Sequence, residues 1–205
     1  MSLYDNLNDV QLDVMREVSN IGAGNACTAL SVLLGRPVDM SVPHVHIMGY
    51  EDTKNHIGGE DSRVLGLKVS VTDDLEGMML QVVHKDFAEL LINTFYPKSI
   101  ASVDDLDDMD ASVLNEMANI TSGAYANSLA SLTNMFVNIG TPDHVAGTID
   151  EIMAMPLEKY IGDGGKVLVI DEQFLIDQEK ITSNMLLVLE SESLKKLLGR
   201  LGVEV

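Results

Sequence analysis

The chain has 205 residues, which is enough for one well-formed core but not for several independent domains. It carries 13 Lys and Arg against 32 Asp and Glu, and the resulting formal charge of −19 argues against binding to nucleic acid or to an anionic membrane surface. The sequence opens without a basic and apolar leader and contains no apolar stretch long enough to span a bilayer, so we expect a cytoplasmic protein without membrane insertion.

The first half of the sequence predicts a long helix, then strands, then a short closing helix. A helical apolar period runs from about Asp9 to Leu34, where the motif GRP ends it. Strand patterns and one amphipathic helix pattern follow, in the order VDMSVPHVHIM (38–48), SRVLGLKVSV (62–71), EGMMLQVVH (76–84) and KDFAELLINTFY (85–96). The polar segment YEDTKNHIGGED (50–61) is typical of an exposed loop.

The second half predicts the same succession. A second long helix is expected from about Asp110 to Thr133. Strands are expected at MFVNIGTP (135–142), KVLVIDEQFLI (166–176) and SNMLLVLES (183–191), a closing helix at ESLKKLLGRLG (192–202), and a loop at EKYIGDGGK (158–166). Aligning LNDVQLDVMREVSNIGAGNA (7–26) with LDDMDASVLNEMANITSGAY (106–125) places many identical residues 99 positions apart. The chain is therefore interpreted as a duplicated unit.

These patterns predict one domain, residues 1–205, made of two homologous halves of about 1–100 and 101–205. Duplicated units usually pack about a pseudo-two-fold axis and share a core, as the subunits of a symmetric dimer do. The predicted fold class is α/β (α+β), with a central and mostly antiparallel sheet covered by helices and the two long helices exposed on one side.

The glycines at 22 and 24 in IGAGNAC resemble part of a phosphate-binding loop. A dinucleotide fingerprint, however, places its glycines directly after a strand and includes a third glycine. Here the preceding residues have a helical period, and the second copy, TSGAYA, keeps only the equivalent of Gly24. We therefore set the nucleotide interpretation aside.

What both copies keep is a polar stripe on one helix face. Its members, spaced i, i+4, i+7 and i+11, are Asp13, Glu17, Asn20 and Gly24 in the first copy and Ser112, Glu116, Asn119 and Gly123 in the second. At about 100° per residue, the first three positions fall within about 60° of arc. We call these stripes the first and second ridges.

The neighbouring face of each helix is apolar, so each ridge should face solvent. We expect this face, which includes Val10, Val14, Val18 and Ile21 in the first copy, to pack on the sheet. The glycine at the end of each ridge would let a partner backbone approach closely.

An exposed Glu and Asn on a helix are most often a solvated surface without further purpose. Two neighbouring polar positions have diverged between the copies, however, with Arg16 against Asn115 and Ser19 against Ala118. The Glu and the Asn of each ridge have not diverged, which favours a functional role.

The pattern [DS]-x3-E-x2-N is met by DVMREVSN and by SVLNEMAN, and with it the sequence resembles the CheC/CheX/FliY family of bacterial chemotaxis phosphatases. Two complete signatures and the two-unit organisation are similar to the CheC type, since a CheX type would carry a single complete signature. The resemblance implies a phosphatase acting on phosphorylated CheY. It also implies binding of CheD, the receptor glutamine deamidase, for which the loop around Gly162 to Gly165 or an exposed strand edge are candidate surfaces.

By the same resemblance, Glu17, Asn20, Glu116 and Asn119 are the expected catalytic residues, and Asp13, Ser112, Gly24 and Gly123 the expected substrate-binding residues. Asn would position the attacking water and Glu would pair with a lysine of CheY. The resemblance implies no cofactor of the protein's own, because Mg²⁺ would be supplied by the active site of CheY. The alternative is a non-catalytic adaptor that binds CheY or CheD through the same ridges.

Two other features are weighed and interpreted without a metal. His44 and His46 alternate along a predicted strand, but no third ligand follows at matching spacing, so both are predicted to be ordinary strand residues. The acidic run at 104–110 is explained by a helix N-terminus in the linker between the halves.

Overall fold

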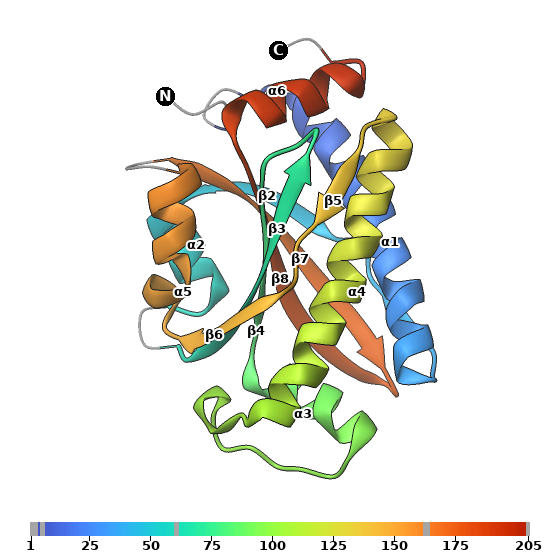
Figure 1. Cartoon of the computed structure of the whole chain (residues 1–205), viewed down its shortest axis with the longest axis vertical. Coiled ribbons are helices and arrows are strands. Elements are labelled where there is room, and N and C mark those ends of the chain that lie inside the picture. Colours follow the sequence, from blue (N-terminus) through green and yellow to red (C-terminus); the bar gives the residue numbers. More distant parts are fainter. Residues whose placement is uncertain (1–3, 5–6, 60–61, 162–164, 204–205) are drawn as a thin grey trace.

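The computed structural model of the chain describes residue 4 and residues 7–59, 62–161 and 165–203. These residues form one 8-stranded sheet with helices on both of its faces (Figure 1). Across these ranges no helix is both long and apolar enough to cross a membrane.

The order helix, two strands, helix, two strands, helix occurs twice. The first set is α1 (Asp9–Leu34), β1 (Val38–Met40), β2 (His44–Gly49), α2 (Tyr50–Ile57), β3 (Val64–Asp73), β4 (Gly77–Val83) and α3 (Lys85–Phe95). After the turn η2 (Val103–Asp105), the second set is α4 (Asp108–Thr133), β5 (Val137–Ile139), β6 (Asp143–Gly147), α5 (Ile149–Pro156), the π-helical turn η3 (Leu157–Ile161), β7 (Lys166–Ile176), β8 (Glu179–Leu189) and α6 (Ser191–Arg200). The elements α4, β5, β6 and α5 each begin 99 residues after α1, β1, β2 and α2.

The two sets exchange strands at both edges of the sheet. Strands β1 and β2 pair with β7, and strands β5 and β6 pair with β3. In the centre β4 pairs with β8, with Leu80 opposite Leu186. Every pairing is antiparallel, which confirms the predicted sheet. Each half of the chain thus supplies the outer strands that cover an inner strand of the other half.

Helices cover the two faces of the sheet in two separate layers. The long helices α1 and α4 pack together on one face, where a large core cluster also takes in α3 and α6 (Figure 1). The opposite face is covered by α2 and α5, which bury Ile57, Ile152 and Met153 against alternate strand residues. Because side chains alternate across a strand, the central strand β4 is buried at every position and serves both cores.

Equivalent caps begin and end the two long helices. Asn8 caps α1 in a reciprocal box with Gln11, its Oδ1 accepting from the Gln11 amide at 3.0 Å. Asp107 caps α4 in the same way, its Oδ1 accepting from the Asp110 amide at 3.0 Å. At the C-termini, Gly35 and Asn134 both adopt left-handed conformations, with φ of 63° and 57°. The sequence predicts α1 within these bounds, whereas α4 begins at Asp108 rather than Asp110 because Asp107 provides the cap.

Two short helices correct the sequence prediction. The segment 50–61 is predicted as a loop but contains α2, in which Thr53, Lys54 and Ile57 are buried. Helix α5 falls where no element is predicted, and residues 158–161 of the second predicted loop lie in η3. Short helices of mixed composition are stabilised by packing of one face rather than by propensity, which explains why sequence pattern alone misses them. Positions 162–164 of the predicted loop lie outside the described residues.

Candidate functional site

Both ridges lie on the solvent side of the paired helices α1 and α4. In the first ridge Asp13, Glu17, Asn20 and Gly24 are all exposed. In the second ridge Ser112, Glu116 and Asn119 are exposed and Gly123 is half-buried. The structure therefore brings the members of each ridge together along one solvent-facing stripe, on a helix whose opposite side is fixed in the core.

The buried face of α1 differs from the one that the sequence predicts. Val18 is buried as expected, but Val14 and Ile21 are only half-buried and Val10 is 62% exposed. Its equivalent in α4, Met109, is 64% exposed. Counted around the helix, positions 10 and 109 extend the two ridges by one turn, so each ridge begins with an exposed apolar side chain.

A groove runs beside each ridge, between the helix and the loop that joins the next two strands. The first groove has a volume of about 580 Å³ and is lined by Asp13, Glu17 and Asn20 on one side and by Val42 to His46 on the other. The second has a volume of about 540 Å³ and is lined by Ser112, Glu116, Asn119 and the segment from Ile139 to Pro142. The two grooves occupy equivalent places in the repeat.

The grooves differ in the pairing of their rim residues. In the first, the Arg16 guanidinium donates to Asp13 Oδ1 at 2.6 Å, and both side chains are well exposed. In the second, Ser112 and Asn115 stand at those positions, and Asn115 Nδ2 lies 3.2 Å from His144 Nδ1. Because an exposed ion pair is worth only about 0–1 kcal/mol, Asp13 can exchange Arg16 for a partner at little cost.

The glycines of the set-aside loop motif lie in the middle of α1 and have different surroundings. A Cβ at Gly22 would stand 2.4 Å from Tyr125 Cδ1, so this glycine allows α4 to approach α1. A Cβ at Gly24 would meet nothing within 4 Å, and one at Gly123 would reach only Ile139 Cδ1 at 3.8 Å. Gly24 thus leaves the surface of the ridge open. Of these two glycines, Gly22 is the one that allows α1 and α4 to pack closely.

A buried polar pair lies beneath this contact. The Tyr125 hydroxyl donates to Glu172 Oε1 at 2.6 Å, and Glu172 Oε2 has no partner among the described residues. Burial raises the pKa of Glu172 to about 7 and raises the pKa of Tyr125 well above its ordinary value. The pair joins α4 to β7 inside the core and is not exposed to either groove.

The acidic lead-in to α4 is partnered by cations of the chain itself. Arg63 Nε donates to Asp104 at 2.9 Å, and Lys98 Nζ donates to Asp107 at 2.6 Å and also to Asp110. The hydrogen bond from Lys98 is the main cause that lowers the pKa of Asp107 to about 2. These carboxylates cap and anchor a helix, in agreement with the sequence interpretation.

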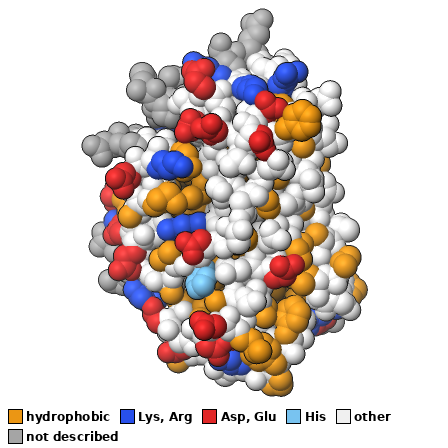
Figure 2. Space-filling view, in the orientation of Figure 1, with side chains coloured by type: hydrophobic (Ala, Val, Ile, Leu, Met, Phe, Trp, Pro, Cys, Tyr) orange, Lys and Arg blue, Asp and Glu red, His pale blue; other side chains and the backbone are white. Residues whose placement is uncertain are grey.

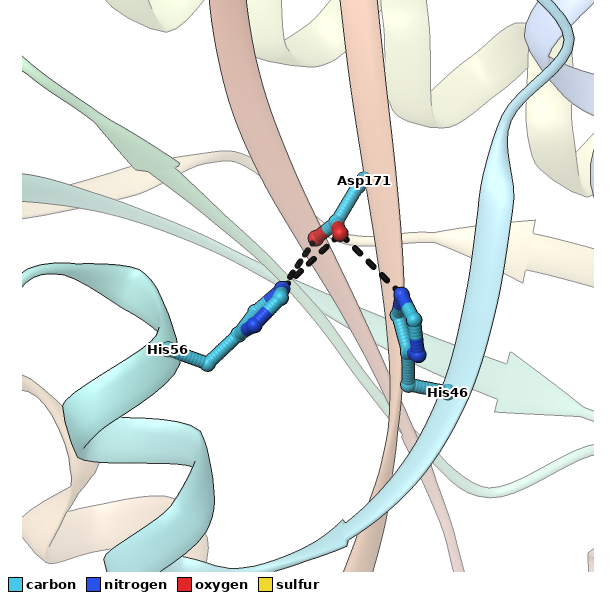
Figure 3. Close-up of side chains that lie close together, drawn as sticks. All are labelled: His46, His56 and Asp171. Carbon is cyan, nitrogen blue, oxygen red and sulfur yellow. Dashed lines mark hydrogen bonds and ion pairs between the residues drawn. The ribbon is translucent and has the colours of Figure 1, made fainter.

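One cluster of potential ligands is not predicted from the sequence. His46 Nε2 lies 3.2 Å from Asp171 Oδ2, and His56 Nε2 lies 2.8 Å from the same oxygen (Figure 3). His46 is on β2, Asp171 on the paired strand β7, and His56 on α2. The pattern of alternating histidines gives one member, but the others depend on strand pairing and on a helix at a predicted loop.

A repeated α/β fold that carries an exposed Glu and Asn beside a groove in each half defines a protein with two equivalent surface sites. The sequence model of the CheC-like family matches residues 10–47 and 109–146, and each matched segment contains one ridge and the loop of its groove. These matches assign the two ridge segments, one in each half of the chain, to the CheC-like family model.

Individual relatives agree with this assignment. The chain is 28% identical over 209 residues to the CheY-P phosphatase CheC of Bacillus subtilis, covering 100% of both sequences. It is 24% identical to the flagellar motor switch phosphatase FliY of the same organism, over 67% of this chain and 36% of that protein. Among solved structures, FliY of Thermotoga maritima matches the fold with a TM-score of 0.74 and 23% identity, covering 96% of this chain and 98% of that one.

Proposed function

We propose that this protein is a phosphatase that accelerates hydrolysis of the aspartyl phosphate of CheY, using one ridge on each of α1 and α4. The observation that carries the proposal is the paired exposure of Glu17 with Asn20 and of Glu116 with Asn119 beside equivalent grooves. The full-length similarity to a protein named CheY-P phosphatase CheC supports the choice of substrate.

The proposed chemistry needs a positioned water rather than a nucleophile from this chain. An aspartyl phosphate is already reactive, and its own active site would supply Mg²⁺ to balance the phosphate charge, so the phosphatase requires no cofactor for this step. The amide of Asn20 or Asn119 can accept a hydrogen bond from a water and donate one to it, which fixes the water in line with the phosphorus. A carboxylate in that place would be repelled by the phosphate oxygens.

The remaining ridge residues would hold the two proteins together. Glu17 or Glu116 would pair with a lysine of CheY, and Asp13 or Ser112 would add a hydrogen bond at the rim. The exposed side chains of Val10 and Met109 would give each ridge an apolar contact at its other end. Gly24 and Gly123 would keep the surface low enough for a partner backbone to approach.

The first test is the decay of phosphorylated CheY in the presence of the wild type, Asn20→Ala, Asn119→Ala and the double variant, with binding affinity measured for each. We expect each single variant to lose the contribution of one site and the double variant to lose all acceleration, while binding persists. Asn55→Ala is the matched control, because Asn55 is an exposed asparagine on α2, on the face of the sheet opposite to both ridges. It should hydrolyse as the wild type does.

Persistent acceleration by the double variant would show that Asn20 and Asn119 do not position the attacking water. No acceleration by the wild type would replace the phosphatase with the adaptor alternative. In that case the ridges are docking surfaces, and Glu17→Ala with Glu116→Ala should weaken binding without any effect on hydrolysis. Binding of CheD, which the family resemblance implies, remains a prediction to be tested with the same variants.

A further inference from the structure

We infer that His46, His56 and Asp171 form a binding site for a divalent transition-metal ion of the Zn²⁺ type. The two histidine Nε2 atoms and the Asp171 carboxylate converge on one point (Figure 3), and the three donor atoms all lie within 4.8 Å of one another. Two imidazoles and one carboxylate are a donor set that suits Zn²⁺ and related ions.

The distances fit an ion with small adjustment. Ligand atoms about 2.0–2.2 Å from a tetrahedral metal lie about 3.3 Å apart. His46 Nε2 is already 3.2 Å from Asp171 Oδ2, whereas His56 Nε2 lies 2.8 Å from the same oxygen and 2.9 Å from Oδ1. A shift of about half an ångström of His56 Nε2 away from Asp171 would bring this pair to the spacing found around a metal, and the two histidine Nε2 atoms already lie within 4.8 Å of each other.

The surroundings of Asp171 resemble those of a metal ligand. Asn184 lies opposite Asp171 on the paired strand β8 and donates from Nδ2 to Asp171 Oδ1 at 2.8 Å. Asn184 is itself buried, so it fixes the orientation of the carboxylate from below. Hydrogen bonds of this kind commonly hold ligating carboxylates in place.

The cluster is open to solvent on its other side. The side chains of His46, His56 and Asp171 are 38%, 32% and 23% exposed, so an ion and a coordinated water can reach them. His56 lies in the last turn of α2, where the helix dipole favours positive charge. The net charge of −19 also favours the approach of cations.

The repeat provides an internal control, because the fold does not need this cluster. Val145 and Met155 stand 99 residues after His46 and His56. Asp171 is the strand partner of His44. The equivalent of His44 is Asp143, whose strand partner is Lys68, so a lysine stands in the place that corresponds to Asp171. The equivalent place in the repeat, formed by β6, α5 and β3, thus has residues that cannot form this site. His46 also lines the first groove, so an ion here would lie at the edge of the first ridge only.

The experiment is titration of the full-length, chelator-treated protein with Zn²⁺ by calorimetry, and with Co²⁺ by visible absorption as a probe of coordination. We expect about one ion per chain and an affinity at least tenfold lower in His56→Ala, in His46→Gln and in Asp171→Asn. Asn184→Ala should lower the affinity about 10–100-fold while leaving all three ligands in place.

His144→Ala is the matched control, since it removes a histidine that contacts Asn115 in the second groove and lies outside the cluster. It should bind Zn²⁺ as the wild type does. If the double variant His46→Ala/His56→Ala takes up as much Zn²⁺ as the wild type, or if the wild type takes up none, the three residues are only a hydrogen-bonded group. Circular dichroism of each variant verifies that a loss of binding does not reflect unfolding.

Discussion

The ring of Tyr125 occupies the space that a side chain at position 22 would need. We expect Gly22→Ala to lower the free energy of unfolding by about 1–2 kcal/mol, because the cost of overpacking exceeds the gain in helix propensity. The ring cannot move aside easily, since it is buried and its hydroxyl is held by Glu172. Chemical denaturation of the variant and the wild type measures the difference.

Gly24→Ala is the matched comparison, two residues further along the same helix. A Cβ there meets nothing within 4 Å, so the variant should be more stable than the wild type by about 0.5–1 kcal/mol. Equal effects at positions 22 and 24 would contradict the proposed role of Gly22 in the packing of α1 on α4.

Glu172 should make the stability of the protein depend on pH near neutrality. Its pKa is raised from its ordinary value of 4.5 to about 7 in the folded state, so folding favours the protonated form. The destabilisation is absent below about pH 4.5, grows as the pH rises and is complete above about pH 7, where it amounts to on the order of 3 kcal/mol. Glu172→Gln should therefore gain stability over the wild type between pH 5 and pH 8.

Thermal unfolding of both proteins across this pH range measures the effect. A constant difference between Glu172→Gln and the wild type at pH 5 and pH 8 would mean that Glu172 is not the titrating group. The partner substitution Tyr125→Phe removes the donor of the hydrogen bond and should leave a similar pH dependence, because burial is the main cause of the raised pKa.

The sequence predicts the exposure of the polar ridge residues, but it misplaces Val10 and does not predict the cluster around His46. The ridges are visible because a helix repeats its exposed face at fixed spacing, and duplication shows the pattern twice. Val10 is placed on the wrong face, because its position around α1 lies close to the ridge rather than to the buried side. His56 and Asp171 are missed because their approach to His46 depends on tertiary contacts.

Among the helices, α4 begins at a cap that also carries an ion pair. Asp107 accepts from the Asp110 amide and from Lys98, and its pKa is lowered to about 2. Asparagine caps a helix about as well as aspartate, so Asp107→Asn retains the cap and loses the charge. The lowered pKa contributes stability that is present above about pH 4 and is lost as the pH falls to about 2.

The wild type should therefore exceed Asp107→Asn in melting temperature at pH 7, and the gap should narrow between pH 4 and pH 2. Repeating the comparison in a Lys98→Gln background separates the ion pair from the cap, because the gap should shrink at pH 7 when the lysine is absent. If the difference in melting temperature is the same with and without Lys98, the effect comes from the charge of Asp107 at the helix N-terminus and not from the ion pair.

Element length decides how far sequence alone predicts this fold. The long helices α1 and α4 have an apolar period and capping residues at both ends, and their bounds are predicted to within two residues. The short helices α2 and α5 lack a full apolar period and capping residues at both ends, and they are stabilised by packing on the sheet. The strands are recognised from their alternation, but alternation does not specify which strand pairs with which.

For the molecule as a whole, the exchange of edge strands makes the two halves interdependent. A chain of residues 1–100 would lack β7, to which β1 and β2 are paired, and its β3 would lose β5 and β6. We therefore expect neither residues 1–100 nor residues 101–205 to form a folded monomer, while the intact chain unfolds in one cooperative transition.

Circular dichroism and amide hydrogen exchange of the separate halves, of their equimolar mixture and of the intact chain provide the measurement. We expect amides in β4 and β8 to be protected from exchange in the mixture of the two halves but not in either half alone. These strands pair with each other at the centre of the sheet, and each half supplies one of them. Independent folding of either half would show that the edge strands are not required for its core.

The acidic side chains visible in Figure 2 are not gathered in one patch. On the face shown in Figure 2, Asp and Glu side chains are spread over the surface and lie among Lys and Arg. Recognition at the ridges is therefore expected to depend on local pairing, such as that of Asp13 with Arg16, more than on a single-signed field.

Finally, the contact between Gly22 and Tyr125 bears on how the two copies of an ancestral unit could diverge. Their equivalents, 99 positions away, are Thr121 and Ala26, so one copy has lost its side chain where the other has gained an aromatic ring. A side chain at position 22 would clash with the Tyr125 ring, so the glycine of one copy and the ring of the other fit together. A contact of this kind favours paired changes, in which each copy evolves with the other as its environment.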